Sequence, residues 1–233
     1  RNIKDAPFPG WARKAERIKI LPELRDKVET LSEMKDAFSH QLSELSSVQK
    51  QVLVERHLIS REQAARSEGS AIVVNRNQTL SIMINEEDHL RLQSIRSGLH
   101  LREAYQLIAN IDKDLEQSLP FAFDHELGYL TACPTNVGTG LRASAMLHLP
   151  GLVISDHIGQ VIQAVGKLGL AVRGIFGEGT ESLGHLFQIS NQSTLGESEE
   201  DILDRLERVI QRVREQERNA RSKLLEEDPQ MLA

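Results

Sequence analysis

The sequence predicts an α+β protein with a largely antiparallel β-sheet flanked by helices. Strand-like runs follow one another with short turns between them, which favours antiparallel pairing over long parallel crossovers. Helical patterns precede and follow these runs. The chain has 233 residues and is 39% hydrophobic, so it is long enough and apolar enough to bury a substantial core.

Helices are predicted in the N-terminal part, after an irregular beginning. Pro22 suits the first turn of a helix, and apolar residues spaced three and four apart continue the pattern to about Glu55. A second, short helix is expected to begin at Ser60. The Ser60 hydroxyl can cap this helix, and Gln63 can return the bond.

A β-hairpin is predicted next, followed by a helix and a short strand. Residues 71–75 are mostly apolar and β-branched, residues 80–84 nearly alternate, and the residues between them are typical of a turn. An apolar stripe predicts a helix over residues 99–119. Residues 129–133 predict a short strand.

The last part of the chain is predicted to contain two strands between two helices. Asp156 is expected to cap the first of these helices. The strands cover residues 171–176 and 186–190, and a long amphipathic helix spans residues 198–225. Residues 142–149 are apolar and rich in Ala, and they fit either a helix or a strand.

Composition excludes several classes of protein. A net charge of −6 argues against a generic nucleic-acid binder, and a single cysteine excludes a disulfide framework and a cysteine-based zinc site. No apolar run approaches the ~20 residues that span a bilayer, and no signal-peptide pattern is present. The expectation is a soluble, cytoplasmic protein.

Three charged or glycine-rich segments lie at the ends of predicted strands. Residues 85–91 contain three consecutive carboxylates, which are either solvated or hold a cation or cationic substrate, and one could act as a general base. Residues 133–143 place small residues and an arginine after a strand, which allows backbone N–H groups to approach an anion. Residues 172–181 add an arginine and two glutamates around a glycine-rich turn. Each segment alone also fits an ordinary polar loop.

The side chains available for chemistry are arginines and one thiol. No Gly-Lys-Ser/Thr motif occurs, so phosphate binding would depend on arginines, of which the chain has 19 against 9 lysines. Cys133 precedes a proline. It is either partly exposed and reactive beside a cation, or a buried thiol at a strand end.

Together these segments resemble the phosphagen (guanidino) kinase family. The matching motifs, in the family's order and spacing, are Asn-Glu-Glu-Asp-His-Leu-Arg (85–91), Cys-Pro-Thr-Asn-Val-Gly-Thr (133–139) with Arg142, and Arg-Gly-x-x-Gly-Glu (173–178). Residues 136–144, 163–174 and 187–192 resemble the bacterial protein-arginine kinases in particular. The resemblance covers roughly residues 1–225 and implies the fold of the guanidino kinase catalytic domain.

The resemblance implies ATP and Mg²⁺ as cofactors. Arg91, Arg142 and Arg173 would bind the phosphates as permanently charged donor forks. His57 resembles a family histidine beside the nucleoside. The backbone expected to line the nucleotide also comprises Ala143, Ser144, Ala145, Met146, Gly174, Ile175, Phe176, Gly177 and Glu178. No protein ligand for Mg²⁺ is expected, because phosphates and water would hold it.

The resemblance also implies a guanidinium acceptor. A guanidinium is cationic and a poor nucleophile until it loses a proton. Glu87 aligns with the family's catalytic base, and Glu178 aligns with the carboxylate that clamps the acceptor. Cys133, as a thiolate, would orient the acceptor, and the carboxylate pair would select guanidinium over ammonium.

The expected domain organisation is a catalytic domain over residues 1–225, with residues 226–233 starting a linker to a further, C-terminal domain. Family members carry the segment Ser-x-Arg-x-Arg-x-x-Arg-Asn where this chain begins, of which Arg1 and Asn2 are present. The resemblance therefore implies that residues 1–233 alone are impaired or inactive, and that the longer protein forms a homodimer.

The expected function is ATP-dependent phosphorylation of arginine side chains in proteins, in bacterial stress response and protein quality control. Two alternatives stay open: a kinase of free arginine or another small guanidino compound, and a non-catalytic homologue that acts as a binding module. By resemblance, the partners would be arginine-containing proteins, an activator or adaptor protein and Clp-type protease machinery. No nucleic-acid or membrane partner is expected.

Overall fold

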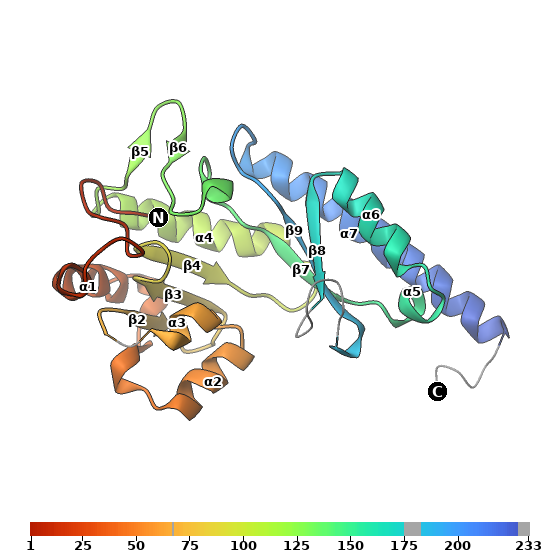
Figure 1. The fold of residues 1–233 in the computed structure, drawn as a ribbon, viewed down its shortest axis with the longest axis horizontal. Coiled ribbons are helices and arrows are strands. Elements are labelled where there is room, and N and C mark those ends of the chain that lie inside the picture. Colours follow the sequence, from red (N-terminus) through yellow and green to blue (C-terminus); the bar gives the residue numbers. More distant parts are fainter. Residues whose placement is uncertain (67, 175–182, 228–233) are drawn as a thin grey trace. The chain divides into compact units, whose positions relative to one another are not determined.

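The computed structural model describes residues 1–66, 68–174 and 183–227 (Figure 1). The chain divides into two compact units, Arg1–Gly140 (the first unit) and Leu141–Ala233 (the second unit), and each is considered by itself. Every strand pair in the described ranges is antiparallel, and helices pack on the strands. The predicted α+β class is therefore confirmed.

The first unit contains a four-stranded antiparallel sheet in the order β1-β2-β3-β4. Its strands are β1 (Phe38–Gln41), β2 (Ala71–Val74), β3 (Leu80–Ile84) and β4 (Leu90–Ser94). The predicted hairpin is confirmed as β2 and β3, with Val73 opposite Ile82. The edge strands β1 and β4 were not predicted, because each is short and is defined mainly by its pairing with a neighbouring strand.

Both faces of this sheet are covered, which explains why β2 and β3 are buried along their whole length. Helices α1 (Lys14–Glu29) and α4 (Leu101–Glu116) pack on the face that carries Val73 and Ile82. The segment with α2 (Ser47–Glu55) and α3 (Arg61–Ala65) covers the opposite face (Figure 1). Two short 3₁₀ turns, η1 (Ser32–Met34) and η2 (Leu42–Glu44), flank β1.

The predicted N-terminal helix is wrong in its limits. Helix α1 begins before Pro22 and contains it, and β1 interrupts the region that was predicted as one helix up to Glu55. Burial of Leu21 and Leu24 on either side of Pro22 stabilises the helix there, which offsets the backbone hydrogen bond that proline cannot donate.

The predicted cap at Ser60 is confirmed in part. The Ser60 hydroxyl accepts a hydrogen bond from the Gln63 N–H at 3.0 Å. Gln63 does not return the bond. Its buried side-chain amide donates to the Ala71 carbonyl at 2.9 Å instead, and this bond fixes α3 against β2.

The predicted helix over residues 99–119 is confirmed as α4. The strand predicted at residues 129–133 is shorter and lies earlier, in the hairpin of β5 (Phe123–Asp124) and β6 (Gly128–Tyr129). Gly128 is required there, because its φ is +81° and an added Cβ would lie 2.8 Å from the Gly138 carbonyl oxygen. A 3₁₀ turn, η3 (Pro134–Asn136), follows Cys133.

The second unit contains a three-stranded antiparallel sheet in the order β7-β9-β8. The strands are β7 (Ser144–His148), β8 (Leu170–Gly174) and β9 (Leu186–Asn191), and the 3₁₀ turn η4 (Leu183–His185) precedes β9. Residues 142–149, which fit either a helix or a strand by sequence, contain the strand β7. Residues 175–176, predicted to extend the strand β8, lie outside the described residues.

Three helices accompany this sheet: α5 (Pro150–Ile154), α6 (Ile158–Lys167) and α7 (Glu199–Glu227). Asp156 does not cap α6, because His157 is the N-cap residue and Asp156 has a φ of 58° in the preceding turn. The long helix α7 is confirmed. It buries the apolar residues predicted to face inward, namely Ile202, Leu203, Leu206, Val209, Ile210 and Val213.

A buried carboxylate joins α7 to α5. Glu217 accepts hydrogen bonds from the N–H groups of Gly151 and Leu152, both at 2.9 Å, and from the Arg221 guanidinium at 2.5 Å. It therefore caps the first turn of α5 from another helix.

We expect Glu217→Ala to lower the free energy of unfolding by about 1–3 kcal/mol, because two N–H groups at the start of α5 lose their acceptor. Urea unfolding followed by circular dichroism would measure this change. Glu215→Ala, at an exposed position of the same helix, is the control and should change little. Equal effects of the two substitutions would contradict the capping role.

Candidate active site

The turn between β3 and β4 is held by buried polar groups. Asn85 is fully buried and adopts a left-handed φ of 56°, which asparagine tolerates better than most residues. Its side-chain amide donates to the carbonyls of Gly69 (2.8 Å) and Arg17 (3.2 Å). Its backbone N–H closes the turn by donating to the His89 carbonyl at 2.9 Å. These bonds fix where Glu86, Glu87 and Asp88 emerge.

Glu86 is a buried, ionised carboxylate. Burial alone would raise its pKa, but hydrogen bonds from the Glu87 N–H and the Ser60 hydroxyl, together with the charge of Arg91, outweigh burial and lower the pKa. Ser60 donates at 2.7 Å, and the Arg91 guanidinium lies 3.4 Å away. Glu86 therefore stays charged and orients Arg91.

The pKa of Glu87, the predicted base, is shifted in the opposite direction from that of Glu86. Its side chain is exposed, and its pKa is raised first by desolvation and then by the negative charges of Asp88 and Glu86, with Glu62 adding to the effect and Arg91 opposing it. A carboxylate that binds a proton more readily than usual suits proton abstraction.

The first unit brings the segments of Glu87 and Cys133 together. Asp88, next to Glu87, accepts a hydrogen bond at 2.7 Å from the N–H of Ala132, which precedes Cys133. Cys133 is partly buried, and its sulfur lies 3.0 Å from the Thr135 hydroxyl. Of the two alternatives left open for this thiol, the structure shows the partly exposed one; its reactivity stays a prediction.

Arg91 lies in the edge strand β4, and His57 lies beside that strand. Arg91 stands in β4 opposite Met83, and its side chain is 47% exposed. Gln93, two residues further and so on the same face, donates its side-chain amide to the His57 carbonyl. His57 has a φ of 56° after α2. Sequence patterns did not indicate Gln93 or Ser60 at the site, because only the fold brings them there.

In the second unit, the register places the predicted phosphate ligands on one face of the sheet. Arg173 in β8 and Met146 in β7 both lie opposite Gln188 of β9. Residues directly opposite each other share a face. The Arg142 guanidinium lies 3.4 Å from the Ser190 hydroxyl, on that same face. Exposed side chains of Arg142, Arg173 and Met146 therefore gather there.

The remaining predicted residues of the second unit are distributed as follows. Ser144 lies on the face that carries Arg173, and its hydroxyl accepts a bond from the Gln188 amide at 2.9 Å. Ala145 and Gly174 lie on the opposite face. Ala143 is buried, and its N–H donates to Asn191 at 2.9 Å. The others lie outside the described residues: Ile175, Phe176, Gly177 and Glu178.

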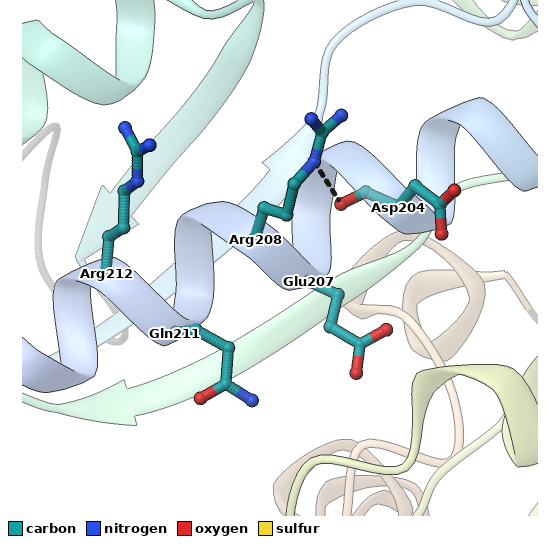
Figure 2. Close-up of a pocket in the computed structure, with 5 residues that line it drawn as sticks. All are labelled: Asp204, Glu207, Arg208, Gln211 and Arg212. Carbon is teal, nitrogen blue, oxygen red and sulfur yellow. Dashed lines mark hydrogen bonds between the residues drawn. The ribbon is translucent and has the colours of Figure 1, made fainter.

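A shallow hollow on one flank of α7 is lined by charged and amide side chains (Figure 2). These are Asp204, Glu207, Arg208, Gln211 and Arg212. Arg208 donates within the helix to the Asp204 carbonyl at 3.2 Å. None of the predicted site residues lines this hollow, so it does not mark the candidate active site.

The described ranges contain neither a metal-binding cluster nor a membrane-spanning helix. Residues 1–66, 68–174 and 183–227 contain no group of three or more His, Cys, Asp or Glu side chains arranged to hold a metal ion. None of their helices has both the length and the apolar character needed to span a bilayer.

A family model described as "ATP:guanido phosphotransferase, C-terminal catalytic domain" matches residues 19–220. The chain belongs to this family. The guanidino phosphotransferase motifs at residues 85–91 and 133–139 and the arginines Arg142 and Arg173 lie inside the matched range.

Curated relatives in the guanidino phosphotransferase family include the protein-arginine kinase of Moorella thermoacetica, 47% identical over 230 residues that cover 96% of this chain. The protein-arginine kinase of Halothermothrix orenii is 46% identical and covers 97% of this chain. The chain spans 65% of the length of each.

Solved structures support the same fold. A duplicated taurocyamine kinase from Schistosoma mansoni with bound transition-state-analogue components superposes with a TM-score of 0.81 at 29% identity, covering 93% of this chain and 31% of that one. A lombricine kinase superposes with a TM-score of 0.80 at 25% identity, covering 96% and 65%.

We expect Glu87→Gln to stabilise the fold slightly at neutral pH. Because the folded state raises the pKa of Glu87, its ionised form is less favourable in the folded than in the unfolded chain, and glutamine removes this cost. The midpoint of thermal unfolding should rise on the order of 1–2 °C, since solvent screens an exposed group.

The gain should vanish as the pH falls below the ordinary pKa of a glutamate, where Glu87 is protonated in both states. Glu126→Gln, at an exposed position of the same unit, is the control. A lower melting midpoint for Glu87→Gln than for the wild-type protein at neutral pH would contradict this account.

Proposed function

We propose that this protein transfers the γ-phosphoryl group of ATP to arginine side chains of proteins. The observation that carries the proposal is the hydrogen bond from Ala132 to Asp88, which joins the segment of a proton-binding carboxylate to that of a thiol within a guanidino phosphotransferase fold. Relatives at 46–47% identity named protein-arginine kinase support the choice of acceptor.

The acceptor half of the reaction uses Glu87 and Cys133. Glu87 takes a proton from the guanidinium, whose nitrogen lone pair then forms the N–P bond as the bond between the γ-phosphorus and the bridging oxygen breaks and ADP departs. The raised pKa of Glu87 favours this proton transfer. Cys133, as a thiolate, orients the guanidinium and offsets its charge.

The phosphate half uses arginines. Arg91, held by Glu86, and the exposed pair Arg142 and Arg173 are the proposed ligands of the ATP phosphates. Their fixed positive charge stabilises the charge that spreads over the transferred group. Mg²⁺ would be held mainly by phosphate oxygens and water. Glu178, outside the described residues, is the proposed acceptor clamp.

The remaining assignments are proposals of the same kind. Residues 1–225 would form the catalytic domain, acting on arginine-containing proteins in the cytoplasm. An adaptor, Clp-type protease machinery and a homodimer stay predictions from the family resemblance. A free guanidino compound is the second candidate acceptor, because the solved taurocyamine and lombricine kinases share this fold.

The proposal is tested by incubating the natural full-length protein with ATP, Mg²⁺ and unfolded casein, followed by mass spectrometry under conditions that preserve N–P bonds. Phosphate on casein arginines is expected. Phosphorylation of free arginine alone would favour the second candidate. ATP binding without either product would indicate a non-catalytic binding module.

We expect Arg142→Ala to weaken ATP binding roughly ten- to hundredfold, because one charge-assisted hydrogen bond to phosphate contributes about 1.5–3 kcal/mol. Isothermal titration calorimetry with ATP would measure this change. Arg214→Ala, at an exposed position of α7, is the control for loss of one positive charge. Unchanged affinity of Arg142→Ala would remove Arg142 from the phosphate ligands.

We expect Cys133→Ser to lower kcat about tenfold or more while ATP affinity stays nearly intact, because a hydroxyl does not supply the thiolate's charge at the acceptor. Steady-state kinetics with casein, together with the ATP titration, would separate these effects. Wild-type turnover in the variant would take Cys133 out of the reaction.

A further inference from the structure

Asp88 connects the segment that carries Glu87 with the segment that carries Cys133. It follows Glu87 directly, and its Oδ1 atom accepts hydrogen bonds from the Ala132 N–H at 2.7 Å and from the Asn2 side-chain amide at 2.6 Å. Ala132 in turn precedes Cys133. One carboxylate oxygen is thus a single residue away from both the proposed base and the proposed thiolate.

Asn2 makes this connection rigid. It is 1% exposed, and its Oδ1 accepts a bond from the His89 N–H at 3.0 Å, while its Nδ2 also donates to the Leu130 carbonyl at 3.2 Å. The Asn2 carbonyl accepts from the Ala122 N–H at 2.8 Å. Asp88 therefore bonds to a side chain that is itself fixed on several sides.

The segment that carries the thiol lacks regular secondary structure of its own. Residues 130–133 lie after β6 and before η3, so no strand ladder sets the position of Cys133. The N–H of Ala132 is satisfied by Asp88, and the Leu130 carbonyl by Asn2. The Leu130 N–H also donates to the Ala122 carbonyl, and the Cys133 carbonyl accepts from the Asn136 N–H, both at 3.0 Å. Loss of the bonds to Asp88 and Asn2 would therefore loosen the thiol segment without detaching it.

We propose that Asp88 is a positioning residue, which sets the distance and angle between the Glu87 carboxylate and the Cys133 thiolate so that both meet one guanidinium. This inference rests on the proposed function. A separate effect supports it: the negative charge of Asp88 helps to raise the pKa of Glu87, after desolvation. In this proposal Asp88 acts through its two neighbours and not by contact with a substrate.

The test compares Asp88→Ala with Asp88→Asn in the natural full-length protein. Alanine removes the acceptor, and kcat/KM for the arginine acceptor should fall about ten- to hundredfold, because small misplacement of reacting groups is costly. The KM for ATP should stay nearly unchanged. Asparagine retains an oxygen that can accept both bonds, so this variant should keep most of the activity.

The two variants should also differ in pH dependence. Asparagine removes the negative charge beside Glu87 and so lowers its pKa, which should move the acidic limb of the kcat profile to lower pH. Loss of activity in Asp88→Asn as severe as in Asp88→Ala, or an unshifted profile, would overturn the inference. Equal losses in ATP and acceptor kinetics with a lower melting midpoint would indicate a merely structural role.

A matched control and an activity-free readout complete the test. Asp124→Ala removes a carboxylate that accepts two backbone N–H bonds in the β5–β6 hairpin, and it should leave the kinetics unchanged. Alkylation of Cys133 by iodoacetamide, followed on its peptide by mass spectrometry, should change severalfold in Asp88→Ala but little in Asp88→Asn. Unchanged alkylation of Cys133 in Asp88→Ala would overturn the inference, and this readout does not require catalytic activity. Absence of arginine phosphorylation by the wild-type protein would instead refute the proposed function.

Discussion

The candidate site of the first unit depends on the hydrogen bonds that the buried side chains of residues 85–89 make with distant parts of the chain, even though the Asn85 Oδ1 atom has no partner among the described residues. Asn85, Glu86 and His89 are each nearly inaccessible to solvent, and each would be costly to bury without partners. Their partners come from distant parts of the chain: Gly69 and Arg17 bond to Asn85, Ser60 to Glu86, and Asn2 to His89. Meeting these requirements leaves little freedom for the turn, so Glu87 is exposed and Asp88 faces Ala132 as a consequence.

Adjacent carboxylates in this turn have pKa values shifted in opposite directions because their surroundings differ. Glu86 has a lowered pKa because donors surround it, whereas Glu87 has a raised pKa because it is partly desolvated among negative charges. Two glutamates of identical intrinsic acidity thus differ in proton affinity: Glu86 is held as an anion, and Glu87 binds a proton more readily than usual. His89 completes the arrangement as a neutral structural group, since burial lowers its pKa to about 4.

The sequence predicted those parts of the fold that have a strong local pattern. The β2–β3 hairpin and α7 follow from alternation and from an apolar stripe, and both were found as predicted. Strands β1 and β4 escaped prediction, since they depend on pairing, and Pro22 is tolerated because its neighbours are buried. Motifs named Glu87 and Cys133 as functional, but the bonds that position them join residues far apart in the sequence. No local sequence pattern predicts the hydrogen bond between Asp88 and Ala132.

Two arginines of the first unit, Arg1 and Arg91, are held by carboxylates. Asp112 accepts from the Arg1 guanidinium at 2.8 and 2.5 Å, the Thr139 carbonyl accepts a further bond from it, and the Tyr129 ring centroid lies 3.4 Å from its Cζ atom. Arg91 is paired with Glu86, whose lowered pKa keeps that carboxylate charged. Paired carboxylates of this kind fix the direction in which a guanidinium points, because their oxygens accept charge-assisted hydrogen bonds from it. Glu87 differs from Glu86 in that its pKa is raised, so under the proposed function Glu87 is the carboxylate suited to take a proton from an acceptor arginine.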